Sequence, residues 1–182
     1  MKKLSMQDIL AQTIKELLED HSPDQITVRD ILEASGISRP TFYKYFIDKQ
    51  DLIGYVFRKE LCEPFFLDYS KALVDREVPF LKYLRKHQNF YLHALELTGQ
   101  NSFYEMWLSL ATDSLVGFYK SNPDYSNVDE KKIHFAAKYL AYAWVNMNIC
   151  WLRNPDGLSA EEMAHQLNSI KDNSIKDFFN DK

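Results

Sequence analysis

Polar and basic side chains between residues 27 and 49 have the types and spacing that reading a nucleic acid requires. Arg39 can donate two parallel hydrogen bonds to guanine O6 and N7, and it stands at the start of a short helical stretch that begins at Ser38. Side chains at that end of a helix point at base edges when the helix enters the major groove. Hydroxyl and ammonium donors follow closely, and such groups bind phosphates without reading sequence: Tyr43, Lys44, Tyr45 and Lys49.

The charge of this segment differs from the charge of the whole chain. The 182 residues carry a net charge of −4, which argues weakly against nucleic acid as a partner. Between residues 36 and 50, however, three basic side chains (Arg39, Lys44, Lys49) face one acid, Asp48, so the local excess is +2. The charge on the contact face matters more than the total.

The sequence shows no motif of a catalytic or metal centre. It lacks G-x-S-x-G, H-E-x-x-H, a glycine-rich phosphate loop and a dinucleotide fingerprint. The five histidines have no ligand spacing with cysteines or carboxylates. Cys62 and Cys150 are far apart and lack a C-x-x-C partner, which excludes a disulfide framework and a zinc ribbon. We therefore expect no enzyme activity, no catalytic residue, no metal and no cofactor.

Four helical stretches in about the first 60 residues would position the polar segment. They start at Ser5, Thr27, Ser38 and Asp48. The starts at Ser5 and Thr27 have an acid three residues on, as in a capping box. Gly36 can take the positive φ of a tight turn between the second and third stretches. The spacing thus predicts a helix-turn-helix.

The second and third stretches are too short to be stable alone. We therefore expect them to form helices only when they pack on the first and fourth stretches. Phe42 and Phe46 fall with Ile37 on the apolar face of the third stretch. We therefore expect both phenylalanines in the core and not at a contact surface.

Beyond Pro64 the helical stretches become longer and rich in aromatic residues. Breaks are expected near Pro79 and near residues 98–100, 121–124 and 154–157. Two long stretches remain, at about 129–153 and 159–179. The predicted fold is all-α, with a three-helix helix-turn-helix domain over residues 1–50 and a larger helical domain over residues 51–182.

Residues 36–52 read G-I-S-R-P-T-F-Y-K-Y-F-I-D-K-Q-D-L. This segment closely resembles the recognition segment of TetR-family regulators, G-(I/V)-S-x-x-T-(F/L)-Y-x-(Y/H)-F-x-x-K-x-x-L, and meets every fixed position. Residues 27–31, T-V-R-D-I, resemble the second helix of the same family. The resemblance implies a helical homodimer that binds a double-stranded DNA operator with its N-terminal heads. It also implies that residues 51–182 form an effector-binding and dimerisation domain, which pairs through its last two helices.

The resemblance also implies roles for individual residues. Arg29, Arg39, Pro40, Thr41 and Tyr45 match base-proximal positions, and Thr27, Tyr43 and Lys49 match phosphate contacts. Ser38 adds a helix N-terminus for phosphate, and Lys44 stands at a position that varies in the family. The sequence also allows Arg29 to pair with Asp30 or Glu33 instead. The expected DNA-binding set is Thr27, Arg29, Ser38, Arg39, Pro40, Thr41, Tyr43, Lys44, Tyr45 and Lys49.

The C-terminal part gives fewer indications. Residues 87–91 and 99–103 are loosely similar to the branch of this family that includes the activator of a dihydroxyacetone kinase operon, which is switched by a kinase-like partner protein. An aromatic pocket would instead suit a flat or apolar small molecule. Weak candidates for ligand contacts are Tyr104, Trp107, Tyr142 and Asn146.

The sequence is best interpreted as a cytoplasmic, sequence-specific DNA-binding regulator of the TetR type that acts as an effector-responsive repressor. No apolar run reaches the roughly 18 residues of a membrane span, so no membrane partner is expected. Two alternatives stay open. One is an activator whose C-terminal domain docks a protein partner, and the other is a helical interaction protein that does not bind DNA.

Overall fold

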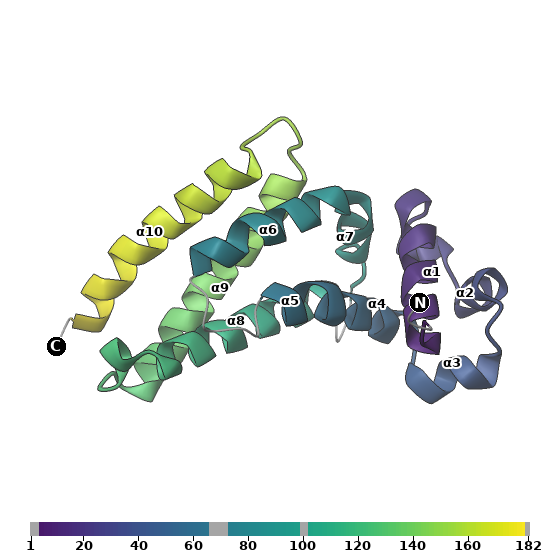
Figure 1. Ribbon diagram of the computed structural model, residues 1–182, viewed down its shortest axis with the longest axis horizontal. Helices are drawn as coiled ribbons and strands as arrows, with labels where there is room; N and C mark the ends of the chain where they lie inside the picture. The colour runs from purple at the N-terminus through teal and green to yellow at the C-terminus, as the bar shows by residue number, and fades with distance from the viewer. Residues whose placement is uncertain (1–3, 66–72, 99–101, 181–182) are drawn as a thin grey trace. The chain divides into compact units, whose positions relative to one another are not determined.

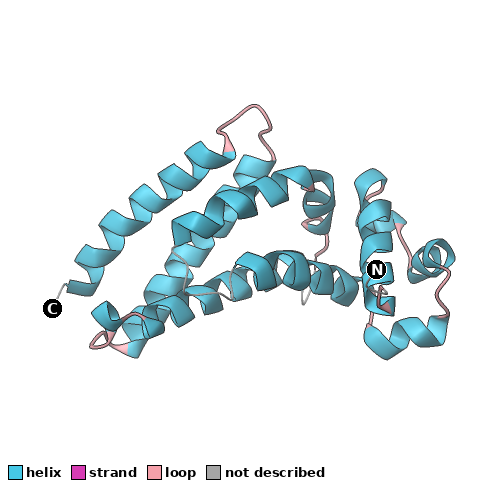
Figure 2. Cartoon of the chain, in the orientation of Figure 1, coloured by secondary structure: helices cyan, strands magenta, loops and turns pink. Residues whose placement is uncertain are grey.

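The computed structural model describes residues 4–65, 73–98 and 102–180, with the side chains of 73–75 and 171–180 left undescribed. Within this part every element is helical (Figure 2), which confirms the predicted all-α class. The chain forms two compact units. The first holds residues 1–61 and 87–106, and the second holds residues 62–86 and 107–182.

The first unit contains the helices that the polar segment needs (Figure 1). They are α1 (Met6–Asp20), the 3-10 turn η1 (Pro23–Gln25), α2 (Val28–Ser35), α3 (Arg39–Tyr45), α4 (Lys49–Phe57) and α7 (Gln88–Ala94). A π-helical turn, η2 (Arg58–Cys62), continues directly from α4. The four predicted starts are therefore confirmed to within a residue.

Side-chain caps explain where these helices begin. Ser5 and Asp8 form a reciprocal capping box at α1, and Thr27 and Asp30 form another at α2. The Asp48 carboxylate accepts a hydrogen bond from the Asp51 backbone N–H at 2.8 Å and so begins α4. Each cap satisfies backbone N–H groups that have no partner inside the helix.

The core of the first unit is apolar and tightly enclosed. Phe42 and Phe46 are 0% and 3% exposed, which confirms their predicted place in the core. The buried apolar residues of α1, α2 and α4 include Leu10, Ile14, Leu18, Ile31, Leu52, Ile53 and Val56. This burial supplies the stability that α2 and α3 lack as isolated helices.

The second unit contains α5 (Glu63–Phe65), α6 (Leu73–Lys86), most of α8 (Phe103–Ser121), the 3-10 turn η3 (Pro123–Tyr125), α9 (Glu130–Leu152) and α10 (Ala160–Asn180). The two long C-terminal helices agree with prediction. Near the C-terminus of α9, the Arg85 guanidinium stacks on Trp151, 3.8 Å from the centroid of its ring. The same guanidinium donates a hydrogen bond to the Trp151 carbonyl oxygen at 2.9 Å.

One predicted break is wrong, because Pro79 lies inside α6 and does not end it. Proline costs a helix one hydrogen bond. Here the exposed proline is followed by the completely buried Phe80, Leu81 and Leu84, whose packing holds the helix together. The chain instead interrupts its helix at His87, where φ is −114° and ψ is 35°. The predicted break at residues 98–100 lies partly outside the described residues.

Candidate functional site

The predicted helix-turn-helix is formed by α2, Gly36 and α3. Gly36 has φ 67° and ψ 14°, a left-handed conformation in which glycine carries no steric penalty. It is the C-cap of α2, and α3 begins three residues later. The turn therefore reverses the chain tightly enough to pack α2 and α3 on the same core.

The structure brings the predicted DNA-binding residues to the surface of these elements. Arg39, Pro40, Tyr43, Lys44 and Tyr45 are exposed on α3, with Tyr43 at 48% and Tyr45 at 37%. Thr41 is half-buried. Because Phe42 and Phe46 occupy the inner face, the outer face of α3 is left to polar and aromatic groups. The caps Thr27 and Ser38, and Arg29, are also exposed.

Neighbouring side chains hold part of this surface in place. The Arg39 guanidinium lies 5.7 Å from the centroid of the Tyr43 ring, one helical turn away, as in a cation–π pair. The Ser38 and Thr41 hydroxyls lie 2.8 Å apart. Such contacts restrict the rotamers of long side chains and lower the entropy lost when they bind.

Lys49 is more enclosed than a free phosphate-binding side chain. Its ammonium donates to the backbone carbonyls of Pro23 at 2.5 Å and Ile26 at 2.8 Å. It thus joins the start of α4 to the loop before α2. An ammonium has three N–H donors, so one remains for a phosphate. The lysine therefore has a structural role, and its phosphate contact stays a prediction.

Electrostatics at the start of α2 favour a charged Asp30. The backbone N–H and side-chain hydroxyl of Thr27 donate to its carboxylate at 2.8 and 2.7 Å. These hydrogen bonds, with a smaller contribution from the charge of Arg29, hold the pKa of Asp30 below its usual value. Within the described part of the chain, Arg29 forms no ion pair with Asp30 or Glu33.

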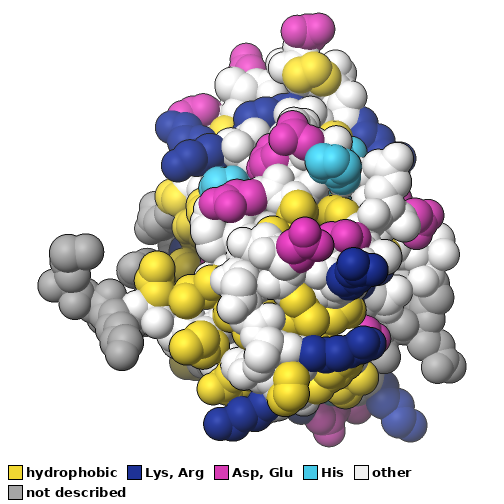
Figure 3. Space-filling model, turned by 90° about the vertical axis from the view of Figure 1, so that its right-hand side faces the viewer, with side chains coloured by type: hydrophobic (Ala, Val, Ile, Leu, Met, Phe, Trp, Pro, Cys, Tyr) yellow, Lys and Arg dark blue, Asp and Glu magenta, His cyan; other side chains and the backbone are white. Residues whose placement is uncertain are grey.

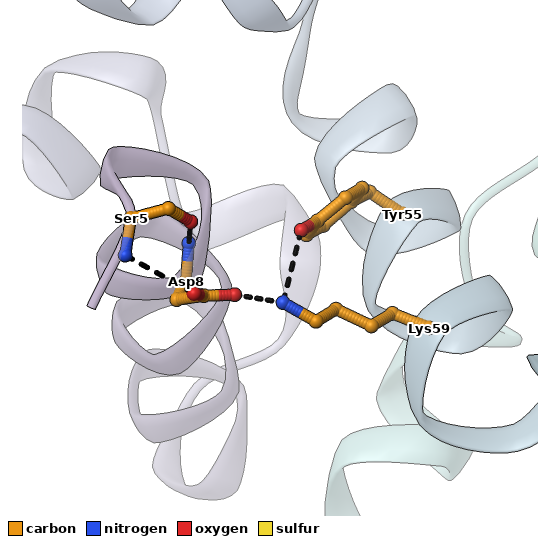
Figure 4. Close-up of polar contacts among 4 residues, drawn as sticks. All are labelled: Ser5, Asp8, Tyr55 and Lys59. Carbon is orange, nitrogen blue, oxygen red and sulfur yellow. Dashed lines mark hydrogen bonds and ion pairs between the residues drawn. The ribbon is translucent and has the colours of Figure 1, made fainter. Parts of the chain in front are cut away.

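Two ion pairs join α1 to the turn η2 behind this surface. Lys59 pairs with Asp8 and also donates to the Tyr55 hydroxyl at 3.2 Å (Figure 4). Lys15 pairs with Glu60 at 2.8 Å. Asp8 therefore serves both the α1 capping box and the ion pair, and α1 and η2 are tied at two points.

Figure 3 shows the side of the molecule on which α2 and α3 lie in Figure 1. Lys and Arg side chains lie on this face among hydrophobic and uncharged polar ones, and acidic side chains are interspersed with them. A mixture of cationic, hydroxyl and aromatic groups is suited to a phosphate backbone with exposed base edges.

A separate cavity lies within the second unit, with a volume of about 220 Å³. Residues of α5, α6, α8, α9 and α10 line it, and most are apolar. The four weak ligand candidates do not line it: Trp107 is buried, Tyr104 is half-buried, and Tyr142 and Asn146 are exposed. Their ligand role stays a prediction.

Sequence reasoning missed a polar network beside this cavity. The buried Glu77 of α6 accepts from the Trp144 indole N–H of α9 at 2.5 Å and from the Asn168 amide of α10 at 2.6 Å. The only available signal was that Arg76 and Glu77 lie just before the apolar residues of the same helix that surround Pro79. One carboxylate thus connects three helices.

Comparison with known proteins identifies the chain. Residues 9–56 match the family described as "Bacterial regulatory proteins, tetR family". Residues 78–173 match the family described as "Transcriptional regulator C-terminal region", which covers more than half of the chain. The chain belongs to the TetR family. Such regulators are non-enzymatic proteins that bind DNA operators and typically dimerise, so this chain is a transcriptional regulator and not an enzyme.

Individual relatives are similar to this chain over nearly its whole length. The HTH-type dhaKLM operon transcriptional activator DhaS of Lactococcus lactis is 27% identical over 184 residues, covering 97% of this chain and 94% of that protein. A solved structure of the dihydroxyacetone kinase operon activator DhaS has a TM-score of 0.70 at 23% identity and covers 96% of this chain and 98% of its own. A TetR regulator from Streptococcus agalactiae 2603V has a TM-score of 0.65 at 15% identity, covering 91% and 92%.

Within the described part of the chain, none of the helices is both long and apolar enough to cross a membrane.

Proposed function

We propose that this TetR-family regulator binds an approximately palindromic operator as a homodimer, with α3 of each copy in a major groove. The observation that supports this is the division of α3 into two faces. Phe42 and Phe46 are buried and hold the helix on the core, while the side chains of Arg39, Tyr43 and Tyr45 are exposed to solvent. Operator half-sites would lie about 34–36 Å apart, or a multiple of that spacing.

The proposed DNA contacts follow the exposed groups of α2 and α3. Arg39, with Arg29, Pro40, Thr41 and Tyr45, would face base edges. Phosphates would be bound by Tyr43, Lys44 and Lys49, together with the helix starts at Thr27 and Ser38. The domain division follows from these roles: residues 1–50 would bind DNA and residues 51–182 would bind the effector and dimerise.

We propose that α9 and α10 form the dimer interface. Phe135 and Tyr139 of α9 are 66% and 65% exposed, and Tyr142 is 42% exposed. The spacing of four and three residues puts the three rings on one helix face. An exposed apolar face of this kind marks an interaction surface. Ile170 of α10, 65% exposed, extends the apolar surface to the last helix.

The proposed regulatory role is that of an effector-responsive repressor in the cytoplasm. The effector would need to bind the DNA-competent and DNA-released conformations with different affinities. A second candidate is an activator, which the full-length similarity to the L. lactis activator DhaS favours. Transcription in vitro from the chain's own upstream promoter separates the two, because added protein lowers the transcript in one case and raises it in the other.

Fluorescence anisotropy with duplexes from the chain's own upstream region tests operator binding. Tight, sequence-selective binding that weakens steeply with salt is the expected result, because phosphate contacts release counterions. Weak binding that is equal for every duplex would contradict operator recognition. It would favour a helical protein whose partner is another protein.

A further inference from the structure

Four aromatic rings follow one another from α4 to the exposed side of α3. Tyr55 of α4 contacts Phe46 with the two ring centroids 5.3 Å apart, and Phe46 contacts Phe42 at 5.9 Å. The Phe42 ring then meets the Tyr43 ring edge-on at 5.3 Å. Aromatic rings attract one another at centroid separations of about 4.5–7 Å. Because Phe42 and Phe46 belong to the buried core, this row holds the Tyr43 ring in place although its side chain is exposed.

The Arg39 guanidinium lies at the outer end of this row. Its carbon atom is 5.7 Å from the centroid of the Tyr43 ring, inside the limit of about 6 Å within which the face of an aromatic ring attracts a cation. Residues four positions apart are neighbours on a helix surface, so the ring and the guanidinium share one side of α3. Among the described residues, no carboxylate forms an ion pair with Arg39. The Tyr43 ring is therefore the neighbour that orients this guanidinium.

Recognition of guanine depends on how the guanidinium is oriented. The two parallel hydrogen bonds to O6 and N7 need the planar fork of the arginine in line with the base edge. A freely rotating arginine loses rotamer freedom when it binds, and it can also turn toward a phosphate, which carries no sequence information. A ring that already restricts the side chain strengthens the contact with the matched base and offers nothing to a mismatched one. The preference for the matched base therefore rises.

Tyr45 provides a comparison on the same helix. Its side chain is also exposed, and the Lys44 ammonium lies 5.4 Å from its ring centroid. Within the part of the chain that the structure describes, however, the Tyr45 ring contacts no other aromatic ring. Its cation is a lysine, which lacks the bidentate fork of arginine. Of these two tyrosines, Tyr43 is the one that joins an arginine to the buried core.

We propose that Tyr43 is a positioning residue for base recognition. Its ring, held by Phe42, orients the Arg39 guanidinium toward guanine and so increases discrimination against other bases at that operator position. The proposal rests on the proposed function, because it needs α3 in the major groove. It gives the two parts of the tyrosine separate tasks: the hydroxyl would bind a phosphate of any sequence, whereas the ring acts through Arg39 on one base pair.

Substitutions that keep or remove the ring test this role in the full-length protein. Discrimination is the ratio of the Kd for a single-base variant duplex to the Kd for the operator, and Arg39→Ala identifies the position at which it is lost. There, Tyr43→Leu should lower the ratio about two- to fivefold, as expected for an exposed cation–π contact. Tyr43→Phe and Tyr43→Trp should keep the wild-type ratio, although both lose the hydroxyl. A wild-type ratio in Tyr43→Leu, or an equal loss in Tyr43→Phe, would overturn the proposal.

Other positions and a second tyrosine control for a general disturbance of α3. At operator positions that Arg39→Ala leaves unchanged, Tyr43→Leu should also keep the wild-type ratio, because the ring acts through one guanidinium. Tyr45→Leu should keep the wild-type ratio at the Arg39 position. Loss at every position in Tyr43→Leu, or an equal loss at the Arg39 position in Tyr45→Leu, would mean that α3 itself is disturbed and would overturn the positioning role.

Nuclear magnetic resonance of the free protein tests the ring contact without DNA. A ring shifts the resonances of a group that lies over its face. The Arg39 Nε–H signal, identified by its disappearance in Arg39→Lys, should therefore move in Tyr43→Leu and stay in place in Tyr43→Phe. An unmoved signal in Tyr43→Leu would refute the positioning role while selective DNA binding stands. A wild-type protein that binds every duplex equally would instead refute operator recognition, and the positioning role with it.

Discussion

At the scale of single residues, we expect the exposed side chains of α3 to make two kinds of contact, with bases and with phosphates. Arg39 can read a guanine through two hydrogen bonds, whereas the Tyr43 hydroxyl would bind a phosphate that every sequence shares. The two side chains also touch each other. Their substitutions therefore test different properties of one surface.

Arg39→Ala is expected to relax base preference at one operator position by about 1–3 kcal/mol. Tyr43→Phe is expected to weaken binding to all duplexes alike, because it removes a donor to phosphate. Anisotropy against the operator and single-base variants measures both. If each variant weakens binding on matched and mismatched duplexes by the same factor, the division into base and phosphate contacts is wrong.

A second residue-scale prediction concerns the capping box of α2. The pKa of Asp30 is lowered in the folded state, chiefly by hydrogen bonds from Thr27. Its stabilising contribution is therefore complete above the unfolded pKa and is lost as the pH falls through the lower folded value. Asp30→Asn should reduce the drop in urea midpoint between pH 6 and pH 3.

Glu33→Gln is the matched control for this prediction, because Glu33 is exposed on the same helix but lies outside the capping box. The control should keep the wild-type pH dependence. An Asp30→Asn protein with the same drop in midpoint as wild type would show that the box does not contribute through its charge.

At the scale of elements, the turn before α3 depends on one backbone conformation. A Cβ at Gly36 would meet no atom within 4 Å, so Gly36→Ala introduces no steric clash. It still costs about 1–2 kcal/mol, because an L-residue is strained at positive φ. Urea denaturation measures this cost.

Gly36→Asn is the informative companion, since asparagine visits this conformation more readily. It should be less destabilising than Gly36→Ala despite its larger side chain. The reverse order would mean that space around the turn, and not its φ, decides the cost.

The elements also show how far sequence could predict this molecule. The starts of α1, α2 and α4 were predictable because their caps lie within three residues of one another. The π-helical turn η2, the continuous helix through Pro79 and the interruption at His87 were not. They depend on contacts between distant residues, such as Lys59 with Asp8, which no local pattern encodes.

The same limit applies to the candidate sites. The exposed residues that we propose to contact DNA were predictable because the short helix α3 carries most of them and its buried phenylalanines fix its orientation. The cavity was not, because Glu77, Trp144 and Asn168 are far apart in sequence and meet only in the folded unit. Aromatic content alone directed attention to Trp107, which is a core residue.

Glu77→Gln tests how much the hydrogen bonds of Glu77 contribute to the free energy of unfolding. The amide can replace one acceptor oxygen but places a donor opposite another donor, so one buried hydrogen bond is lost. We expect the free energy of unfolding to fall by about 1–3 kcal/mol. Glu161→Gln, which changes an exposed partner of Lys82, should leave the free energy of unfolding almost unchanged, because exposed ion pairs contribute little. Equal effects would mean that Glu77 does not brace the three helices.

At the scale of the whole molecule, DNA affinity should depend on assembly. Two heads held by one dimer contact twice as many phosphates as one head, and the salt dependence of binding scales with that number. The exposed rings of α9 are expected to hold the two copies together. The assembly therefore sets both the affinity and its response to salt.

Replacing Phe135 and Tyr139 together by glutamate should produce monomers, because like charges would then face each other across the interface. Sedimentation velocity should show half the wild-type mass, and the slope of log affinity against log salt should fall to about half. Asp113→Lys, an exposed charge change on α8, should alter neither. A double variant that stays dimeric would move the interface away from this face of α9, and a monomer with an unchanged salt slope would show that only one head of the dimer binds DNA.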